Sequence, residues 1–369
     1  MRLRDLGIKV GRFPAGQRNS IADVDGVTVG HSTVIHGDGE LRIGKGPART
    51  GVTVIVPHGG DTWTEPRFAG WFTLNGVGEW TGLHFIAETG SLYGNVYTTN
   101  SHSIGTVRDA IIASESKRRN DEFMVLPVVG ETFDGGLNDI AGLHVHAEHV
   151  DEATRTASAD VAEGSVGGGT GMICHGFKGG IGTSSRIVET AGSSYTVGVI
   201  VQANHGERDG FQVNGVPVGS IIGRDVVPDP WEPQTSQLLG EKNSILITVA
   251  TDAPLLPNQC TRLAHRATLG IAMNGGTGHY TSGDFALAFS TVDQGVAAFD
   301  LGAPKVISGL VCLSNSSLDP LFDSVVECTQ EAILNALVAA ETMVGRDGVT
   351  AYGLDPALLR KVVSEYRHL

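Results

Sequence analysis

An uninterrupted apolar run places the strongest constraint on how this chain can fold. The seven residues from Ser244 to Ala250 read Ser-Ile-Leu-Ile-Thr-Val-Ala, without alternation of polar and apolar side chains. Isoleucine, valine and threonine suit a pleated strand, and a strand that does not alternate is a buried one. A polar loop marked by Gly240 precedes the run. We therefore predict a buried strand whose first residue, Ser244, lies at the end of a polar loop.

Glycine supports a fold with many strands and tight turns. It occupies 51 of the 369 positions, about double the usual share of ~7%. The glycines separate strand-like runs without a fixed period, which indicates tight turns and close backbone approaches rather than a linker. Many of these runs follow one another directly, which argues against a strict βαβ alternation and favours layers of sheet flanked by helices. The clearest runs are residues 52–57, 123–130, 194–201, 244–250 and 281–291.

Apolar residues at helical spacing predict three longer helices, at residues 104–119, 256–273 and 318–344, and a short helix from Leu354. Pro257 and Pro320 suit the first turns of the second and third helices. The third helix has a narrow face of small residues, and Gly345 and Gly348 are expected to end it. Residues 207–243 are the most loop-like part of the chain and the only plausible internal boundary.

The overall charge and the cysteines exclude several classes of protein. The formal charge is −14, and 41% apolar with 18% charged residues is typical of a globular chain. This acidic balance argues against a nucleic-acid partner, and we predict neither a signal peptide nor a membrane span. The cysteines are scattered without a Cys-x-x-Cys pair, at positions 174, 260, 312 and 328. Free thiols in a reducing, cytoplasmic compartment are therefore expected.

Two further patterns invite a metal or nucleotide interpretation. On an extended strand, His144, His146 and Glu148 would share one face, and two histidines with a glutamate form a zinc ligand set. An exposed strand face with solvated histidines is the alternative. The glycine-rich loop 164–171 matches neither the P-loop nor the dinucleotide fingerprint, and we interpret it as structural turns. We predict no metal and no cofactor.

Ser244 is either an ordinary serine at the start of a strand or a nucleophile. The chain has no Gly-x-Ser-x-Gly motif, which disfavours an α/β-hydrolase. If Ser244 were the first residue of a processed chain, its own α-amino group, with a pKa of ~7.7–8.0, could act as its base. Self-cleavage would use the same hydroxyl, which would attack the Asn243 carbonyl and give an ester that water opens.

Several separated motifs resemble one known family. Asn243-Ser244 with the following strand as far as Pro257, and residues 282–291 (Ser-Gly-Asp-Phe-Ala-Leu-Ala-Phe-Ser-Thr), are similar to the L-aminopeptidase/D-Ala-esterase-amidase family, which includes the β-peptidyl aminopeptidases. The likeness extends to residues 19–24, 127–140 and 201–204, and so covers essentially the whole chain. Any one of these motifs alone would not be specific.

This resemblance implies a fold and a processing event. The fold would be a four-layer α/β/β/α sandwich that resembles the N-terminal nucleophile hydrolases with different connectivity. The chain would be a single catalytic domain, 1–369, that cleaves itself between Asn243 and Ser244 into an α chain of 1–243 and a β chain of 244–369. The processed protomers would form a tetramer.

The resemblance also assigns roles to individual residues. Ser244 would be the nucleophile in processing and in substrate cleavage, and Ser282 and Asp284 would orient it and relay its proton. Asn204 would donate to the oxyanion, and Glu131 would bind the free ammonium group of the substrate. Asp284 stands at a position where glutamate is expected. Phe133 would lie beside the substrate, at a position where some members of the family have tyrosine. In the alternative interpretation Ser282 and Asp284 cap a turn and Asn204 satisfies loop backbone.

We therefore expect a serine aminopeptidase that releases N-terminal residues from short peptides, amides or esters. Whether it prefers L-α, D-α or β-amino residues stays open at this stage. The second hypothesis is an acyltransferase of the ornithine acetyltransferase type, although those enzymes process before threonine. The third is a non-enzymatic metal-binding or scaffold protein that uses the face of His144, His146 and Glu148.

Overall fold

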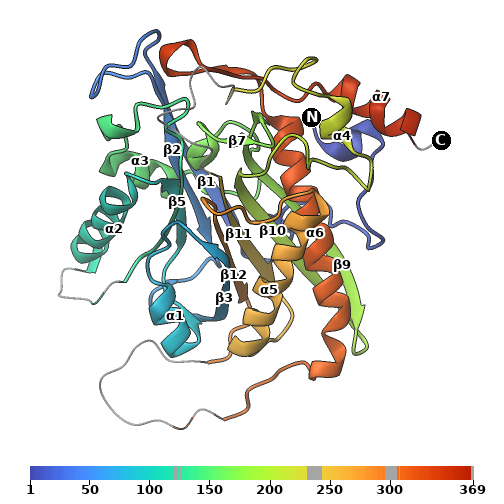
Figure 1. Cartoon of the computed structure of the whole chain (residues 1–369). Coiled ribbons are helices and arrows are strands. Elements are labelled where there is room, and N and C mark those ends of the chain that lie inside the picture. Colours follow the sequence, from blue (N-terminus) through green and yellow to red (C-terminus); the bar gives the residue numbers. More distant parts are fainter. Residues whose placement is uncertain (120–123, 125, 231–242, 296–305, 307, 367–369) are drawn as a thin grey trace.

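Two β-sheets lie face to face, and each is covered on its outer side by helices (Figure 1). The computed structural model describes residues 1–119, 124, 126–230, 243–295, 306 and 308–366. From left to right in Figure 1 the layers are α2 with α3, the first sheet, the second sheet, and α5 with α6. The predicted α/β/β/α sandwich is therefore confirmed.

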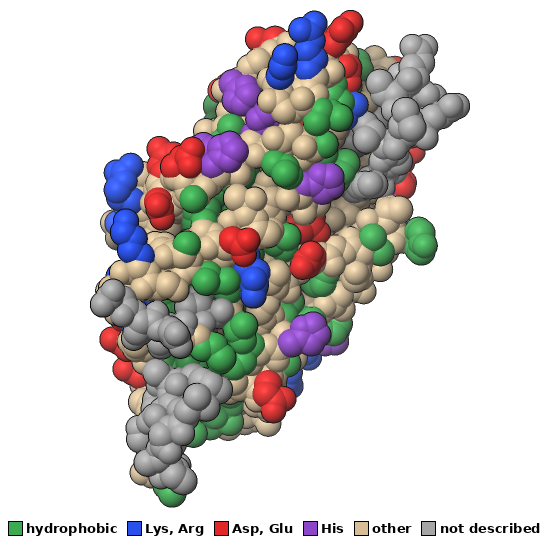
Figure 2. All heavy atoms as spheres, turned by 90° about the vertical axis from the view of Figure 1, so that its left-hand side faces the viewer, with side chains coloured by type: hydrophobic (Ala, Val, Ile, Leu, Met, Phe, Trp, Pro, Cys, Tyr) green, Lys and Arg blue, Asp and Glu red, His purple; other side chains and the backbone are tan. Residues whose placement is uncertain are grey.

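The first sheet has four strands in the order β1-β2-β5-β6: Thr28–His36, Ala48–Val56, Val96–Asn100 and Val128–Thr132. Neighbouring strands are antiparallel except β5 and β6, which are parallel and are joined through α2, Ile104–Arg119. Helices α2 and α3, Ala147–Arg155, pack on the outer face through a cluster that includes Val54, Ile111 and Val150. Figure 2 faces this helical layer and shows acidic, basic and histidine side chains intermixed on its surface.

The second sheet has six strands in the order β4-β3-β12-β11-β10-β9. Their bounds are Ser91–Leu92, Arg67–Gly76, Gly283–Ser290, Ser244–Thr251, Ser193–Asn204 and Gly180–Thr190. Only the central pair, β11 and β12, is parallel, and α5, Pro257–Met273, connects these two strands. Helix α6, Asp319–Ala339, packs beside α5 on the outer face of β9 and β10.

An apolar interface between the sheets explains the apolar run of β11. Val29, Ile55 and Val96 of the first sheet meet Ile200, Leu246 and Leu287 of the second. The other side chains of β11, among them Ile245 and Ile247, point into the cluster beneath α5 and α6. All eight residues of β11 are buried, because one face meets a sheet and the other meets helices. The strand predicted at residues 244–250 is confirmed.

Two predicted elements need correction. Helix α6 ends at Ala339, because Ala340 is extended and Met343–Val344 (β13) pairs with Thr350–Ala351 (β14). Gly345 and Gly348 therefore lie in the turn of a hairpin. The face of α6 is not narrow either, since every residue from 328 to 338 is buried. The strand expected at 123–130 begins only at Val128, with residues 120–123 and 125 outside the described part of the chain.

The other elements agree with the sequence. Helix α2 has the predicted bounds, α5 begins one residue later than expected, and the tail forms α7, Pro356–Tyr366. The glycine-rich loop 164–171 contains a 3₁₀ turn at Gly167–Gly169 and packs on backbone, as a structural role requires. The loop-like region 207–243 contains the short helix α4, Val218–Ile221, and residues 231–242 lie outside the described residues. Apart from further 3₁₀ turns, the described residues also form α1 (Leu83–Thr89), β7 (Ile173–Cys174) and β8 (Phe177–Lys178).

The hydropathy of the helices bears on membrane insertion. Among the residues that the structure describes, no helix combines the length and the apolar character needed to cross a bilayer.

Close packing of α6 on β9 depends on Gly182. A Cβ there would lie 2.0 Å from the Ala332 carbonyl oxygen and 2.5 Å from the Ala336 nitrogen, both in the backbone of α6. We expect Gly182→Ala to lower the free energy of unfolding by at least about 1–3 kcal/mol, because the helix must move away from the sheet. Gly105→Ala on α2 is the control, since nothing lies within 4 Å of that position and alanine favours the helix. Urea unfolding monitored by circular dichroism measures both, and equal stability of the two variants would contradict this packing.

Candidate active site

Ser244 lies at the start of the central strand of the second sheet. It pairs with Asn204 at the end of β10 on one side and with Gly283 at the start of β12 on the other. The side chain is almost fully buried, with 5% of its surface exposed. The apolar run of β11 fixes the serine in this position, because moving the strand by one residue would exchange the two faces.

The Asn243–Ser244 peptide bond receives two polar contacts. The Ser244 hydroxyl donates to the Asn243 carbonyl oxygen over 2.6 Å. The Gly283 N–H lies 3.2 Å from that carbonyl oxygen and 3.2 Å from the Ser244 Oγ. A backbone N–H aimed at a carbonyl oxygen is the donor that a tetrahedral intermediate at that carbon needs. The geometry thus polarises the bond whose cleavage was predicted.

Ser282 and Asp284 flank Gly283, the residue at the start of β12 that pairs with Ser244. The Ser282 hydroxyl donates to Asp284 Oδ1 over 2.6 Å, so the two side chains do share a face. Burial raises the pKa of Asp284 to about 6, although the hydrogen bond from Ser282 opposes the shift. Asp284 Oδ2 is buried without a hydrogen-bond partner among the described residues. A carboxyl group that titrates near neutrality can both accept and return a proton.

A narrow cavity connects these groups with residues that the sequence did not single out. Its wall contains Asn243, Ser282 and Asp284 together with His205, Glu207 and His279. His279 Nδ1 lies 2.9 Å from Glu207 Oε1, and the His279 carbonyl accepts the Ser282 N–H over 2.8 Å. His205 directly follows the predicted Asn204, which was the only signal in the sequence. His279 carried no signal, because it reaches the cavity through a turn.

Glu131 approaches the same region from the first sheet. Its carboxylate accepts the Glu79 N–H over 2.9 Å and a hydrogen bond from the Ser101 hydroxyl. Burial raises the pKa of Glu131. A Cβ on Gly78 would lie 3.0 Å from Glu131 Oε1, 3.1 Å from the Phe285 ring and 3.3 Å from the Gly283 Cα, so Gly78 lies between Glu131 and the start of β12. The structure thus brings Glu131 close to the strand position beside Ser244.

Asn204 and Phe133 are joined by a hydrogen bond. Asn204 Oδ1 accepts the Ile173 N–H over 2.8 Å, and its Nδ2 donates to the Phe133 carbonyl oxygen over 3.0 Å. These contacts agree with the alternative interpretation, in which the Asn204 side chain serves as a hydrogen-bond partner for the backbone of neighbouring loops. They also tie the segment that carries Glu131 to the strand that pairs with Ser244. The Phe133 ring is half-buried and covers Gly135.

The prediction that His144, His146 and Glu148 share one face of a strand is wrong. His146 caps α3, and Glu148 lies exposed in the first turn of that helix. His144 Nε2 lies 2.9 Å from Asp139 Oδ2, and the His144 ring packs edge-on against the His36 ring. The period-two pattern was misleading, because the chain turns into a helix at His146.

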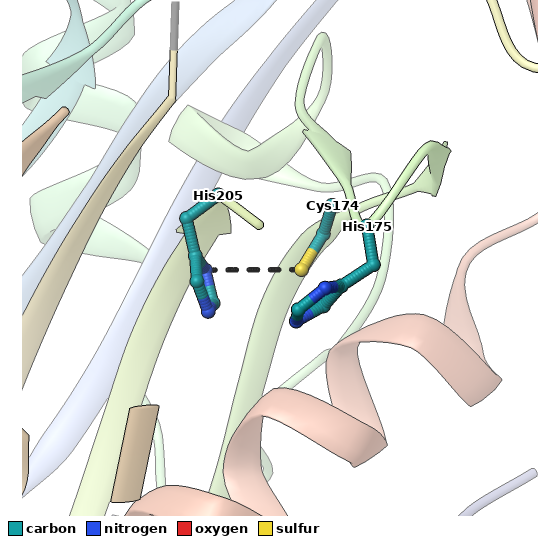
Figure 3. A group of neighbouring side chains, drawn as sticks. All are labelled: Cys174, His175 and His205. Atoms are coloured by element: carbon teal, nitrogen blue, oxygen red, sulfur yellow. Dashed lines mark hydrogen bonds between the residues drawn. The ribbon is translucent and has the colours of Figure 1, made fainter. Parts of the chain in front are cut away.

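A different group has the composition of a metal site. Within the described residues, Cys174, His175 and His205 can each offer a ligand atom, and these atoms lie within 4.8 Å of one another (Figure 3). The two histidines are far apart in sequence and meet where the β7–β8 hairpin lies against the end of β10.

Comparison with known proteins identifies the class. The profile of peptidase family S58 matches residues 19–351. The β-peptidyl aminopeptidase BapA of Sphingosinicella microcystinivorans is 45% identical over an alignment 374 residues long, gaps included, that covers 100% of this chain and 93% of that protein. A β-aminopeptidase structure from a Burkholderia species superposes with a TM-score of 0.90 at 45% identity, over 99% of each chain.

A third relative supports the fold. The structure of the L-aminopeptidase D-Ala-esterase/amidase of Ochrobactrum anthropi, described as a variant of the Ntn hydrolase fold, superposes with a TM-score of 0.85 at 39% identity. It covers 100% of this chain and 99% of that one. The chain belongs to peptidase family S58. It is a hydrolase of the aminopeptidase class.

The raised pKa of Asp284 predicts that the free energies of unfolding of the wild type and of an Asp284→Asn variant differ by an amount that depends on pH. Between the unfolded-state value of 3.8 and about 6, the folded protein keeps a proton that the unfolded chain releases. The stability that this proton confers is present below pH 3.8 and is lost as the pH rises to about 6. Asp284→Asn resembles the protonated form, so the variant should gain stability relative to Asp284 across this window, on the order of 3 kcal/mol.

Urea unfolding at several pH values tests this, with both proteins carrying Ser244→Ala so that neither contains a cut chain. A stability difference that does not change with pH would contradict the burial of an ionisable Asp284.

Proposed function

We propose that this chain is a self-processing serine aminopeptidase in which Ser244 is the nucleophile, first for its own peptide bond and then for substrate. The observation that carries the proposal is the arrangement at the Asn243–Ser244 bond. The Ser244 hydroxyl and the Gly283 N–H both lie at the Asn243 carbonyl oxygen, at 2.6 and 3.2 Å. The comparison with S58 peptidases supports the activity, and the geometry supports the choice of residues.

Processing begins with attack of the Ser244 Oγ on the Asn243 carbonyl carbon. The negative charge develops on the oxygen to which the Gly283 N–H donates. The bond between Asn243 carbon and Ser244 nitrogen then breaks, the nitrogen takes a proton to become an amine, and Asn243 is left as an ester on Ser244. Water hydrolyses the ester, which releases chain 1–243 with a terminal carboxylate and restores the hydroxyl.

The new amino terminus completes the catalytic group. An α-amino group has a pKa of ~7.7–8.0, so its neutral form is available near pH 8 to take the hydroxyl proton. Ser282, hydrogen-bonded to Asp284 at 2.6 Å, relays or positions that proton. Asn204 pairs with Ser244 across the strands and contributes to the oxyanion site once the Asn243 peptide has left.

Glu131 provides the selectivity for a free N-terminal amine. It is a buried carboxylate beside Gly78, which also lies against Gly283, and an ammonium group is the natural partner of such a charge. The substrates are therefore short peptides, amides or esters with a free amine. Two relatives at 45% identity are named for β-amino substrates, so β-aminoacyl compounds are our first choice and D-alanyl compounds the second.

The processed protein is expected to assemble as a tetramer of αβ protomers that requires no cofactor. This expectation rests on the family resemblance, and light scattering of the purified protein would test it. The S58 match favours hydrolysis over the acetyltransferase alternative.

Ser244→Ala tests the nucleophile. The purified wild type should run as two bands on a denaturing gel, while Ser244→Ala should remain one full-length band and lose at least about 10⁴-fold in kcat/KM. Ser290→Ala is the matched control, because it also removes a buried serine hydroxyl from the central strands but one that donates to the Ala253 carbonyl. Normal processing of Ser244→Ala, or loss of processing in both folded variants, would contradict the assignment.

Glu131→Gln tests the ammonium site. The variant keeps the shape of the side chain but removes the charge, so KM for an aminoacyl anilide should rise by about 10- to 100-fold with a smaller effect on kcat. Exposed Glu148→Gln, on α3, serves as the control and should leave KM unchanged. An unchanged KM in Glu131→Gln would remove Glu131 from the binding site.

A further inference from the structure

Cys174, His175 and His205 form a compact cluster that the proposed peptidase chemistry does not use. Cys174 ends β7, His175 begins the turn to β8, and His205 follows the last residue of β10. All three side chains are buried, and Figure 3 shows the two imidazoles and the sulfur turned toward a common volume. A cluster of this composition calls for an explanation, because unpaired polar groups are costly to bury.

The spacing of the ligand atoms fits a tetrahedral zinc ion. Cys174 Sγ lies 3.8 Å from His205 Nδ1, and the ligand atoms of the three residues lie within 4.8 Å of one another. Zn–S and Zn–N bonds of about 2.3 and 2.1 Å at a tetrahedral angle place sulfur and nitrogen about 3.6 Å apart. The Cys174–His205 pair would need to close by only about 0.2 Å, while the other pairs, which lie within 4.8 Å, would need to close by up to about 1 Å.

His175 presents a lone pair to the cluster. His175 donates its Nδ1–H to the Glu207 carbonyl oxygen over 3.0 Å, which leaves Nε2 as the acceptor atom. Neither His175 Nε2 nor His205 Nε2 has a hydrogen-bond partner among the described residues. A ring that donates one N–H to a carbonyl and presents its other nitrogen is the arrangement that metal-bound histidines adopt.

The backbone holds the cluster in place before any ion arrives. His175 and Gly176 have φ values of 50° and 69° and form the two-residue turn between β7 and β8. The His175 N–H donates to the His205 carbonyl over 2.8 Å, which joins the turn to β10. A left-handed backbone is uncommon for residues other than glycine, although histidine is among the side chains that tolerate it, and such conformations concentrate at functional sites.

Burial keeps the ligands neutral in the absence of an ion. It raises the pKa of the Cys174 thiol to about 12 and lowers the pKa of His175 to about 4. Neutral imidazole is the form that binds a metal. The thiol must lose its proton to the solvent as the metal–sulfur bond forms, and a divalent ion promotes this step.

We propose that Cys174, His175 and His205 bind a thiophilic transition-metal ion, with zinc as the best fit, and that solvent occupies the fourth position. One thiolate and two imidazoles suit zinc or copper(I) rather than magnesium or calcium. His205 also lines the narrow cavity whose wall contains Ser282 and Asp284, so the proposed metal site adjoins the candidate active site. Because His205 follows Asn204, a bound ion would hold the end of β10 beside Ser244.

Cobalt(II), a spectroscopic substitute for zinc, tests the proposal with the full-length protein, reduced and freed of metal. One equivalent should give a thiolate-to-cobalt charge-transfer band in the near ultraviolet together with tetrahedral d–d bands, and one equivalent of zinc should abolish both. Cys174→Ser should lose the charge-transfer band and bind zinc at least about 100-fold more weakly. Exposed Cys312→Ser is the control and should keep both properties.

His175→Asn provides a second test that does not remove the sulfur. Asparagine tolerates the left-handed backbone, so this variant should stay folded while its zinc affinity falls. No charge-transfer band in the wild type, or the same band and affinity in Cys174→Ser, would overturn the proposal. None of these measurements depends on peptidase activity, so the metal site and the proposed function fail or succeed separately.

Discussion

The rest of the structure depends on the burial of β11 on both faces. One face of the strand meets the first sheet through Leu246, and the other meets α5 and α6 through Ile245 and Ile247. A strand enclosed in this way has one register, because a shift by one residue would turn every side chain to the wrong layer. The Asn243–Ser244 bond is thereby held where Gly283 on the parallel neighbour can donate to its carbonyl oxygen.

The same burial determines the electrostatics of the site. Asp284 and Glu131 both have raised pKa values because they lie in regions of low dielectric constant, yet their surroundings differ. Glu131 accepts two hydrogen bonds, whereas one oxygen of Asp284 has no partner among the described residues. We infer that the first is prepared to bind a cation and the second to exchange a proton, which matches the two roles that the resemblance assigned.

Local patterns allowed much of the fold to be predicted from the sequence. The bounds of α2 and the start of α5 follow from helical spacing and from Pro257, and β11 follows from its apolar composition. The end of α6 could not be predicted, because no glycine or proline marks Ala339 and the chain leaves the helix to form the β13–β14 hairpin. The region of His144 to Glu148 was misread, since alternating polar residues resemble a strand until tertiary contacts define the cap of α3.

The site was predictable only in part, for a similar reason. Ser244, Ser282 and Asp284 lie in motifs that the family resemblance identified, and the sheet register brings them together. The Gly283 N–H has no side chain to reveal it in a sequence. The cluster of Cys174, His175 and His205 depends on a hairpin packing against a strand about thirty residues away, which spacing rules for metal ligands do not describe.

Trapping the processing intermediate tests the central claim most directly. If the Ser244 hydroxyl attacks the Asn243 carbonyl, newly made precursor incubated with hydroxylamine should release the 1–243 fragment with a hydroxamate at Asn243 in place of the carboxylate. Mass spectrometry of that fragment distinguishes the two termini. A hydroxamate at Asn243 is the predicted result. Cleavage at another bond, or a carboxylate at Asn243 however much hydroxylamine is present, would contradict an ester on Ser244.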